Sequence, residues 1–305
     1  MDVELTRVRE LRFRDGTPVR AASAVARFRE GFLVAQDDAT HAAWLRGEEA
    51  ERVRLLPPEQ GHETFDEASG TKHLKPDLEA ALEVTVGDFP GVLLLGSGSS
   101  PLRTRWSHVH HQGAGTQHRV ADMTALYTVV AQALGVAPDL LNMEGACVVG
   151  ETVRWFHRGM PSAGWPSSSV DLPLEAALQA ALGRAGSEDV PVADATTYDL
   201  GEVDGVGLAI TDAVALPDGS VLVSAAAEDS PHPRDDGPVV GSALALIRDG
   251  AVRSVVELPR VGGRVAKVEG LTLLDLSRDA AAVLAVVDAD DAQSPSVALH
   301  LRVRR

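Results

Sequence analysis

Short apolar runs separated by turns occur along the whole chain and predict β-strands from one end to the other. Residues 3–13 alternate apolar and charged positions, most clearly at Leu11 and Phe13, which is typical of a half-exposed strand. Asp15-Gly16 then marks a turn. Four short strands are predicted next, at 22–28, 31–36, 41–46 and 51–56. A polar connection over residues 57–76 separates this set from the rest of the chain.

Four further sets of apolar runs follow this connection. The second set is predicted at 79–86, 91–96, 103–110 and 117–123, and the third at 144–149, 152–157, 167–172 and 196–203. The fourth is predicted at 212–216, 221–227, 242–247 and 252–258, and the fifth has three runs, at 269–274, 281–287 and 296–303.

Two amphipathic helices are predicted between the strands. Residues 123–134 place apolar side chains on one face, with Asp122 positioned to cap the first turn and Gly135 to end the helix. A second helix is predicted to start at Pro173, a residue suited to a first helical position. Its apolar stripe consists of Leu174, Ala177, Leu178, Ala181 and Leu182.

The first strand of each set begins with a polar residue followed by alanine or glycine. The five copies are Ala22-Ser23-Ala24, Leu78-Glu79-Ala80, Met143-Glu144-Gly145, Thr211-Asp212-Ala213 and Val268-Glu269-Gly270. Four-stranded units at such long, similar spacings are typical of β-propeller blades. We therefore predict an all-β fold, a single domain over residues 1–305 in which five blades form one propeller. The strand at 3–13 would complete the three-stranded fifth blade and close the ring, and the two helices would be short insertions. A two-sheet sandwich is the alternative, but it does not explain five matched starts.

Propeller geometry brings the repeated residues together. The first strand of each blade lines the central channel, so Ser23, Glu79, Glu144, Asp212 and Glu269 are expected to converge at one mouth. The small residue after each one suits close packing around a narrow channel. Turns between the second and third strands lie at the same mouth. They carry Asp38, Arg103, His157, Arg158, Glu228 and Asp229.

Four converging carboxylates create an electrostatic problem. Two charges about 4 Å apart repel by roughly 4 kcal/mol at an effective dielectric constant near 20. A bound cation would solve it, and a ring of oxygen ligands suits Ca²⁺ better than octahedral Mg²⁺. Ion pairs with Lys75 and Lys267, or protonation of the carboxyl groups, are the alternatives.

Composition narrows the classes of partner. The formal net charge is −16, which disfavours nucleic acid. No apolar run approaches the roughly 20 residues that cross a bilayer, and the N-terminus lacks the pattern of a signal peptide. The single cysteine, Cys147, lies in an apolar run and is expected to be a buried packing residue. We expect a cytoplasmic monomer.

Two functions remain open from these residues. One is a metal-dependent hydrolase, phosphoesterase-like or nucleotidase-like, that acts on a small anionic molecule. Its anion would be bound by Lys72, Lys75, Arg103, Arg158 and Lys267. Its general base would be Glu228, Asp229 or Asp38, with His157 as a further candidate. The other, which we favour, is a non-catalytic propeller that binds a small ligand or a partner at the same mouth, with the ion in a structural role.

Other chemical motifs are weak. The chain has no nucleophile elbow, no phosphate-binding glycine loop and no zinc-type spacing of His and Cys. His108, His110 and His111 look like metal ligands, but a strand places His111 on the face opposite the other two. We expect an exposed polar strand there.

Several motifs between residues 75 and 300 together resemble an uncharacterised family of bacterial propeller proteins, similar to the esterase-like phytase propellers. They are Asn142-Met143-Glu144-Gly145, Phe156-His157-Arg158-Gly159, Thr211-Asp212-Ala213, Ala226-Ala227-Glu228-Asp229, Asp236-Gly237-Pro238 with Gly241-Ser242, and Lys267-Val268-Glu269-Gly270. The order of the five central residues also resembles the calcium ring of five-bladed calcium-activated nucleotidases. Asp212 departs from the serine that this second resemblance implies.

Overall fold

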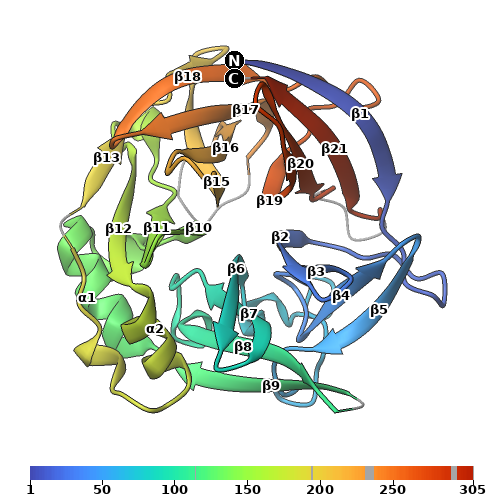
Figure 1. Cartoon of the computed structure of the whole chain (residues 1–305), viewed down its shortest axis with the longest axis vertical. Coiled ribbons are helices and arrows are strands. Elements are labelled where there is room, and N and C mark those ends of the chain that lie inside the picture. The colour runs from blue at the N-terminus through green and yellow to red at the C-terminus, as the bar shows by residue number, and fades with distance from the viewer. Residues whose placement is uncertain (114, 194, 231–236, 290–293, 305) are drawn as a thin grey trace.

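Five small antiparallel sheets are arranged in a ring around a central channel in the computed structural model (Figure 1). The structure describes residues 1–113, 115–193, 195–230, 237–289 and 294–304. Asp236, which belongs to one of the family motifs, lies outside these residues. The all-β prediction of a five-bladed propeller is confirmed. No helix in the described residues is long and apolar enough to span a membrane.

Blades 1 to 3 follow the chain order, with the innermost strand first. Blade 1 contains β2 (Ala22–Phe28), β3 (Gly31–Gln36), β4 (His41–Arg46) and β5 (Glu49–Arg54). Blade 2 contains β6 (Leu78–Val86), β7 (Phe89–Gly96), β8 (Arg105–Gln112) and β9 (Gly115–Asp122). Blade 3 contains β10 (Met143–Val149), β11 (Thr152–His157), β12 (Ser167–Pro173) and β13 (Thr196–Tyr198).

Blade 4 differs from the prediction by one extra strand. Besides β15 (Val206–Ala215), β16 (Val221–Glu228), β17 (Val239–Arg248) and β18 (Ala251–Glu257), it includes the short β14 (Glu202–Val203). The run predicted at 196–203 is therefore divided between two blades. Asp199 accepts a hydrogen bond from the amide of Gly201, whose φ of 78° ends the extended run.

Blade 5 is completed by the N-terminal strand. It contains β19 (Val268–Leu276), β20 (Ala280–Val287) and β21 (Val297–Arg304), and β1 (Asp2–Glu10) pairs with β21 in antiparallel register from Asp2–Arg304 to Glu10–Val297. Figure 1 places both chain ends side by side at this seam. The predicted ring closure is confirmed. The predicted strand at 3–13 ends earlier, and Phe13 instead bridges to Ala50 of blade 1.

Within the part of the chain that the structure describes, the hydrophobic core is divided into five clusters, each lying between two neighbouring blades. The largest side chains are in the cluster between blades 2 and 3, where the indoles of Trp106 and Trp155 meet edge to face at 5.4 Å. Burial of each large apolar side chain is worth about 1.5–3 kcal/mol. Because no cluster belongs to a single blade, the closed ring is what buries the apolar faces.

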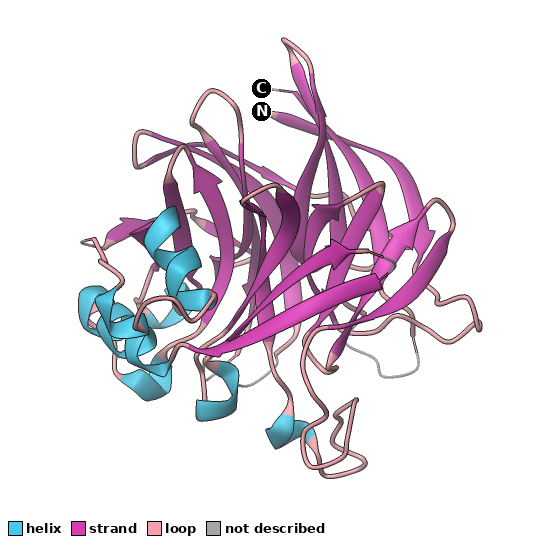
Figure 2. Cartoon of the chain, turned by 60° about the horizontal axis from the view of Figure 1, so that its bottom comes forward, coloured by secondary structure: helices cyan, strands magenta, loops and turns pink. Residues whose placement is uncertain are grey.

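Two α-helices add to the cluster between blades 2 and 3. They are α1 (Thr124–Leu134) and α2 (Leu174–Ala181), and Figure 2 shows them together on one side of the molecule. Asp122 accepts hydrogen bonds from the amide and hydroxyl of Thr124, and Gly135 ends α1 at φ 67°, as predicted. Pro173 immediately precedes α2 instead of occupying its first turn.

Candidate functional site

Every channel-lining strand has an irregularity in its pairing at the repeated polar position. The register shifts at Ser23 in β2, at Glu79 in β6, between Met143 and Ala146 in β10, at Thr211 in β15 and at Glu269 in β19. A β-bulge leaves one residue unpaired and turns its side chain out of the regular alternation. The repeat is therefore a structural one, and in the fourth blade its member is Thr211 in place of the predicted Asp212.

Asp212 is buried among backbone amides and is not among the residues that line the cavity at the mouth of the channel. Its carboxylate is buried and accepts a hydrogen bond from the Leu271 amide at 2.6 Å. Burial raises the pKa of this carboxyl well above its usual range, although hydrogen bonds from backbone amides, including those of Ala213 and Ala146, act in the opposite direction. We therefore remove Asp212 from the predicted ring of metal ligands.

The two hydroxyl members of the repeat connect neighbouring blades. Ser23 Oγ donates to the Leu78 carbonyl at 2.6 Å, and Thr211 Oγ1 donates to the Val268 carbonyl at the same distance. Each acceptor is the residue that precedes the repeated position in the next blade. The remaining three members, Glu79, Glu144 and Glu269, line the cavity at the mouth of the channel.

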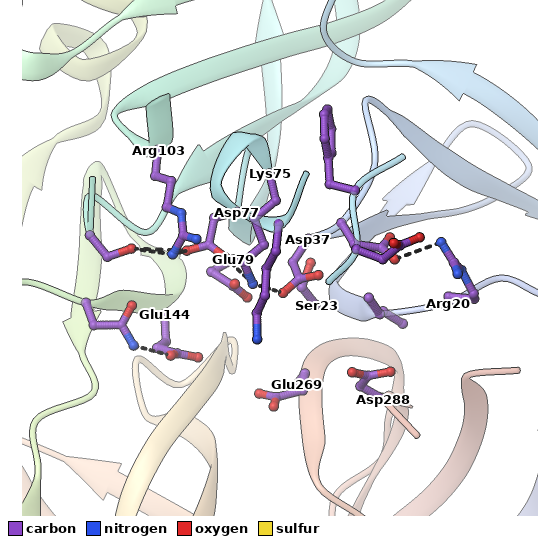
Figure 3. Close-up of a pocket in the computed structure, with 18 of the residues that line it drawn as sticks. Arg20, Ser23, Asp37, Lys75, Asp77, Glu79, Arg103, Glu144, Glu269 and Asp288 are labelled. Atoms are coloured by element: carbon purple, nitrogen blue, oxygen red, sulfur yellow. Dashed lines mark hydrogen bonds and ion pairs between the residues drawn. The ribbon is translucent and has the colours of Figure 1, made fainter. Parts of the chain in front are cut away.

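This cavity has a volume of about 610 Å³, enough for a small molecule. Figure 3 shows Glu79, Glu144 and Glu269 pointing into it from three different blades. Of the residues predicted for ligand or metal binding, those that line the cavity are Ser23, Lys72, Lys75, Glu79, Arg103, Glu144, Arg158, Lys267 and Glu269.

One side of the cavity contains a chain of ion pairs centred on Asp77, a residue that the sequence reasoning missed. Lys75 Nζ lies 2.5 Å from Asp37 Oδ2 and 2.7 Å from Asp77 Oδ1, and Arg103 lies 3.0 Å from Asp77 Oδ2. The hydroxyl of Ser97 also donates to Asp77. Burial by itself would raise the pKa of Asp77, but Lys75 and Arg103 lower it to about 2. The charges of the two carboxylates and the two cations in this chain of ion pairs therefore balance. Asp77 directly precedes the repeat in blade 2, and this position was the available clue.

The opposite side contains a second chain of ion pairs. Arg158 lies 2.5 Å from Glu228 and 3.5 Å from Glu144, while Lys267 lies 3.2 Å from Glu228 and 2.9 Å from Glu269. Burial opposes ionisation of Glu228, but Arg158 and Lys267 lower its pKa overall. Three acids face two bases in this chain, so one negative charge is left over.

Glu79 lies between the two chains and adds a further negative charge. Among the described residues its carboxylate has no hydrogen-bond or ion-pair partner, although Lys75 attracts it at longer range. Burial and the charges of Asp77 and Glu144 raise the pKa of Glu79 well above its usual range. Burial and the charge of Glu269 likewise raise the pKa of Glu144 to about 7. Among the described residues of the two ion-pair chains and Glu79, the carboxyl groups therefore exceed the side-chain cations by two, and their full ionisation would require a further cation.

The four predicted general bases have different environments. Asp38 lines the cavity, pairs with Arg20 at 3.1 Å, and has a buried Oδ1 without a hydrogen-bond partner in the described structure. Burial and the neighbouring Asp37 raise its pKa to about 7.

The other three predicted bases are less available. Glu228 is paired with Arg158 and Lys267 and accepts a hydrogen bond from the Gly237 amide at 2.8 Å. Asp229 is exposed, and neither it nor His157, which is buried against the Leu140 carbonyl, lines the cavity.

The histidines of β8 do not line this cavity. The rings of His108 and His110 stack at 5.2 Å on one face, while His111 lies near Trp44. The predicted separation onto two faces is confirmed. However, His108 is buried, so the expectation of an exposed strand is wrong at that residue.

Carboxylate oxygens in the cavity match the ligand type that Ca²⁺ prefers. In the described residues, Asp37, Asp77 and Glu79 each offer an oxygen, and these atoms lie within 4.8 Å of one another. The five residues of the predicted ring do not form such a group in the described structure. The alternative of ion pairs using Lys75 and Lys267 also matches the observed contacts. Both lysines neutralise part, but not all, of the carboxylate charge.

Solved structures with a similar fold share little sequence with this chain. They include a hypothetical protein from Leishmania major, with 10% identity and a TM-score of 0.48 over 97% of this chain and 90% of that one. The mannose phosphorylase MPT-4 from Leishmania mexicana, solved with phosphate, has 12% identity and a TM-score of 0.47 over 97% and 88%. A protein of unknown function from Dyadobacter fermentans has 13% identity and a TM-score of 0.44 over 99% of both chains. Similarity at this level carries no argument about function.

The sequence comparisons are more specific about ancestry. No curated protein matches the chain. One family model matches residues 71–292, more than two thirds of the 305 residues, and this range includes Glu79, Glu144 and Glu269. The finer similarities to phytase-like propellers and to calcium-activated nucleotidases stay predictions. The chain belongs to the family of unknown function DUF6910.

Proposed function

We propose that this protein is a binding propeller that takes up Ca²⁺ and, beside it, a small anionic molecule in the cavity at the mouth of its channel. The observation that carries the proposal is the excess of two carboxyl groups over paired cations among the described residues, with Glu79 unpaired there, inside a cavity of about 610 Å³. Two excess negative charges correspond to one divalent cation. Neutralisation by two protons would be the alternative.

The bound ion would be held by Glu79, Asp37 and Asp77, with Glu144 nearby in the same cavity. All four supply oxygen atoms, and Ca²⁺ accepts six to eight such ligands in flexible geometry. A calcium ion would supply a positive centre that attracts an anionic ligand. Such a centre is needed because Lys75, Arg103 and Arg158, three cations of the cavity, are already paired with carboxylates.

Replacement of Glu79 by Gln tests the calcium site. Without Ca²⁺, Glu79→Gln should raise the melting temperature, because it removes a carboxyl group whose ionised form is opposed by burial and by the charges of Asp77 and Glu144. Addition of Ca²⁺ should raise the melting temperature of the wild type by mass action and leave the variant nearly unchanged. Calorimetric titration with CaCl₂ and with MgCl₂ should give binding for the wild type and a preference for Ca²⁺.

Glu83 offers a matched control for this experiment. It lies four residues further along β6, at the opposite end of the channel. Glu83→Gln should retain the full calcium effect. If wild type, Glu79→Gln and Glu83→Gln all respond equally to CaCl₂, or none responds, the calcium site is refuted.

One observation favours the hydrolase as a second candidate. The carboxyl of Asp38 lines the cavity with one oxygen free of hydrogen-bond partners in the described structure, a geometry suited to accepting a proton from an attacking water. Its raised pKa is consistent with that role. A panel of phosphate monoesters and diesters with Ca²⁺ provides the test. Turnover by the wild type that Asp38→Asn abolishes, with calcium binding retained, would establish this alternative over simple binding.

A further inference from the structure

We infer that Lys75 is a tethered competitor for the cation: its ammonium group occupies carboxylate oxygens that Ca²⁺ uses when bound, and calcium displaces it. This inference rests on the proposed function and adds its regulation. The sequence predicts that Lys75 binds an anion, so this role is a different one for the same residue.

The position of the ammonium group supports this reading. Lys75 Nζ contacts Asp37 and Asp77 at 2.5 and 2.7 Å. These two carboxylates and Glu79 are the group whose oxygens lie within 4.8 Å of one another, a spacing compatible with one shared cation. The ammonium group of Lys75 therefore already neutralises Asp37 and Asp77, two of the three carboxylates in this group. Among the described residues, the third, Glu79, has no direct partner (Figure 3).

The surrounding contacts indicate that the lysine can leave without disrupting the backbone. Asp77 retains Arg103 at 3.0 Å and the Ser97 hydroxyl after Lys75 departs. The backbone on either side is fixed independently, because the Asp77 amide donates to the Asp37 carbonyl at 3.1 Å and Leu74 is buried. The lysine side chain is a flexible four-carbon stem with a strongly hydrated head. Its withdrawal into the cavity would therefore leave the oxygens of Asp37 in place for a metal ion.

The competition has a direct consequence for affinity. An internal ammonium group is present at every calcium concentration, so calcium must displace it before using these oxygens. A neutral side chain of similar length at position 75 should strengthen calcium binding by about tenfold or more, since tenfold corresponds to only about 1.4 kcal/mol. The lysine would thereby set the calcium concentration at which the site fills.

The small number of lysines makes a direct measurement possible. The chain contains Lys72, Lys75 and Lys267, and amine acetylation of each can be followed separately by mass spectrometry. With excess CaCl₂, acetylation of Lys75 should accelerate severalfold. The reactivity of Lys72, which is about half exposed and pairs with Glu67, should stay the same. Lys267, held between Glu228 and Glu269, serves as a buried reference and should change little.

Variants provide the second measurement. Calorimetric titration should show tighter CaCl₂ binding for Lys75→Met than for the wild type, while Lys72→Met binds as the wild type does. Without calcium, Lys75→Met should melt at a lower temperature, and CaCl₂ should restore it. Lys75→Arg keeps the charge and should retain the weaker, wild-type affinity.

The outcomes separate this inference from the proposed function. Calcium binding by the wild type with no change in Lys75 acetylation, or with equal or weaker binding by Lys75→Met, overturns the inference and leaves the proposed function standing. Binding by Lys75→Met but not by the wild type refutes calcium as the natural occupant and supports the competitor role. If neither protein binds CaCl₂, both proposals fall.

Discussion

The two ends of the channel are built from the same five strands yet differ in chemistry. At one mouth the cavity of about 610 Å³ is lined by acidic and basic side chains from several blades. At the other end, a smaller cavity of about 370 Å³ is lined mostly by alanine, valine and leucine from β2, β6, β10, β15 and β19. Arg27 and Glu83 are the charged residues among those described there.

The contrast arises where the bulges interrupt the strands. Beyond the bulge, regular alternation directs small apolar residues toward the axis, and the strands approach closely. A Cβ on Gly145 would lie 2.4 Å from the Asp212 Cα, and one on Gly270 would lie 2.9 Å from the Ala24 Cα. At the mouth, the bulges and the links that enter each blade present polar side chains instead. The fold brings the five bulged positions together at the mouth of the channel, and the side chains at these positions determine whether the mouth is charged or neutral.

The largest effect is expected for Asp77 at the charged end. Asp77→Ala leaves Lys75 and Arg103 partly buried without their shared partner, which should lower the free energy of unfolding by about 3–5 kcal/mol. Urea denaturation measures this loss. Glu30→Ala, at an exposed carboxylate, is the control and should change stability by about 0.5 kcal/mol or less. Equal effects at both positions would show that the ion-pair chain contributes no stability.

Close packing at the narrow part of the channel gives the next largest effect. Gly145→Ala forces a methyl group against the backbone of Asp212 and should cost about 1–3 kcal/mol. A Cβ on Gly115 meets no atom within 4 Å, so Gly115→Ala serves as the control. If urea denaturation finds the two variants equally stable, the strands are not in close contact at the axis.

The hydroxyl connections between blades should contribute less. Thr211→Val keeps the shape of the side chain but removes the hydrogen bond to Val268, at an expected cost of about 0.5–1.5 kcal/mol. Thr6 donates a similar bond to His300 in an exposed position, so Thr6→Val should cost less. A larger loss for Thr6→Val would contradict the assignment of Thr211 to the structural repeat.

The charged end should also make stability depend on pH through Asp38. Its pKa is raised to about 7 by burial and by Asp37, from an ordinary value of 3.8. Between these values the folded protein binds more protons than the unfolded chain, so this group's contribution to stability is full below pH 3.8 and is lost as pH rises through 7. Denaturation of wild type and Asp38→Asn at several pH values should show a steeper loss of stability in the wild type, because Glu144 titrates in the same range in both proteins. If the stabilities of the two proteins change in parallel with pH, the pKa of Asp38 is not raised.

Much of the architecture could be predicted from local patterns. Apolar runs and turns gave the strands, and the spacing of the polar-small pairs gave five blades closed by the N-terminal strand. In blade 4 the observed bulge falls one residue before the predicted position, which the sequence indicates because Asp212 resembles the acidic residues of the other copies. The bulge in β15 instead places the hydroxyl of Thr211 at the equivalent position. Asp77 was missed because its one clue, a position directly before the repeat of blade 2, does not distinguish a charged cavity residue from an ordinary turn residue.

The sequence by itself determined the ring and the identity of three of its inward-facing acids, Glu79, Glu144 and Glu269. Periodicity is a local property, so it can be read along the chain. Only the tertiary structure decided how charge is distributed around those acids, because ion pairs such as Arg158–Glu228 join residues 70 positions apart. It decided in the same way that Glu79 is left without a direct partner while Lys75 contacts the carboxylates beside it.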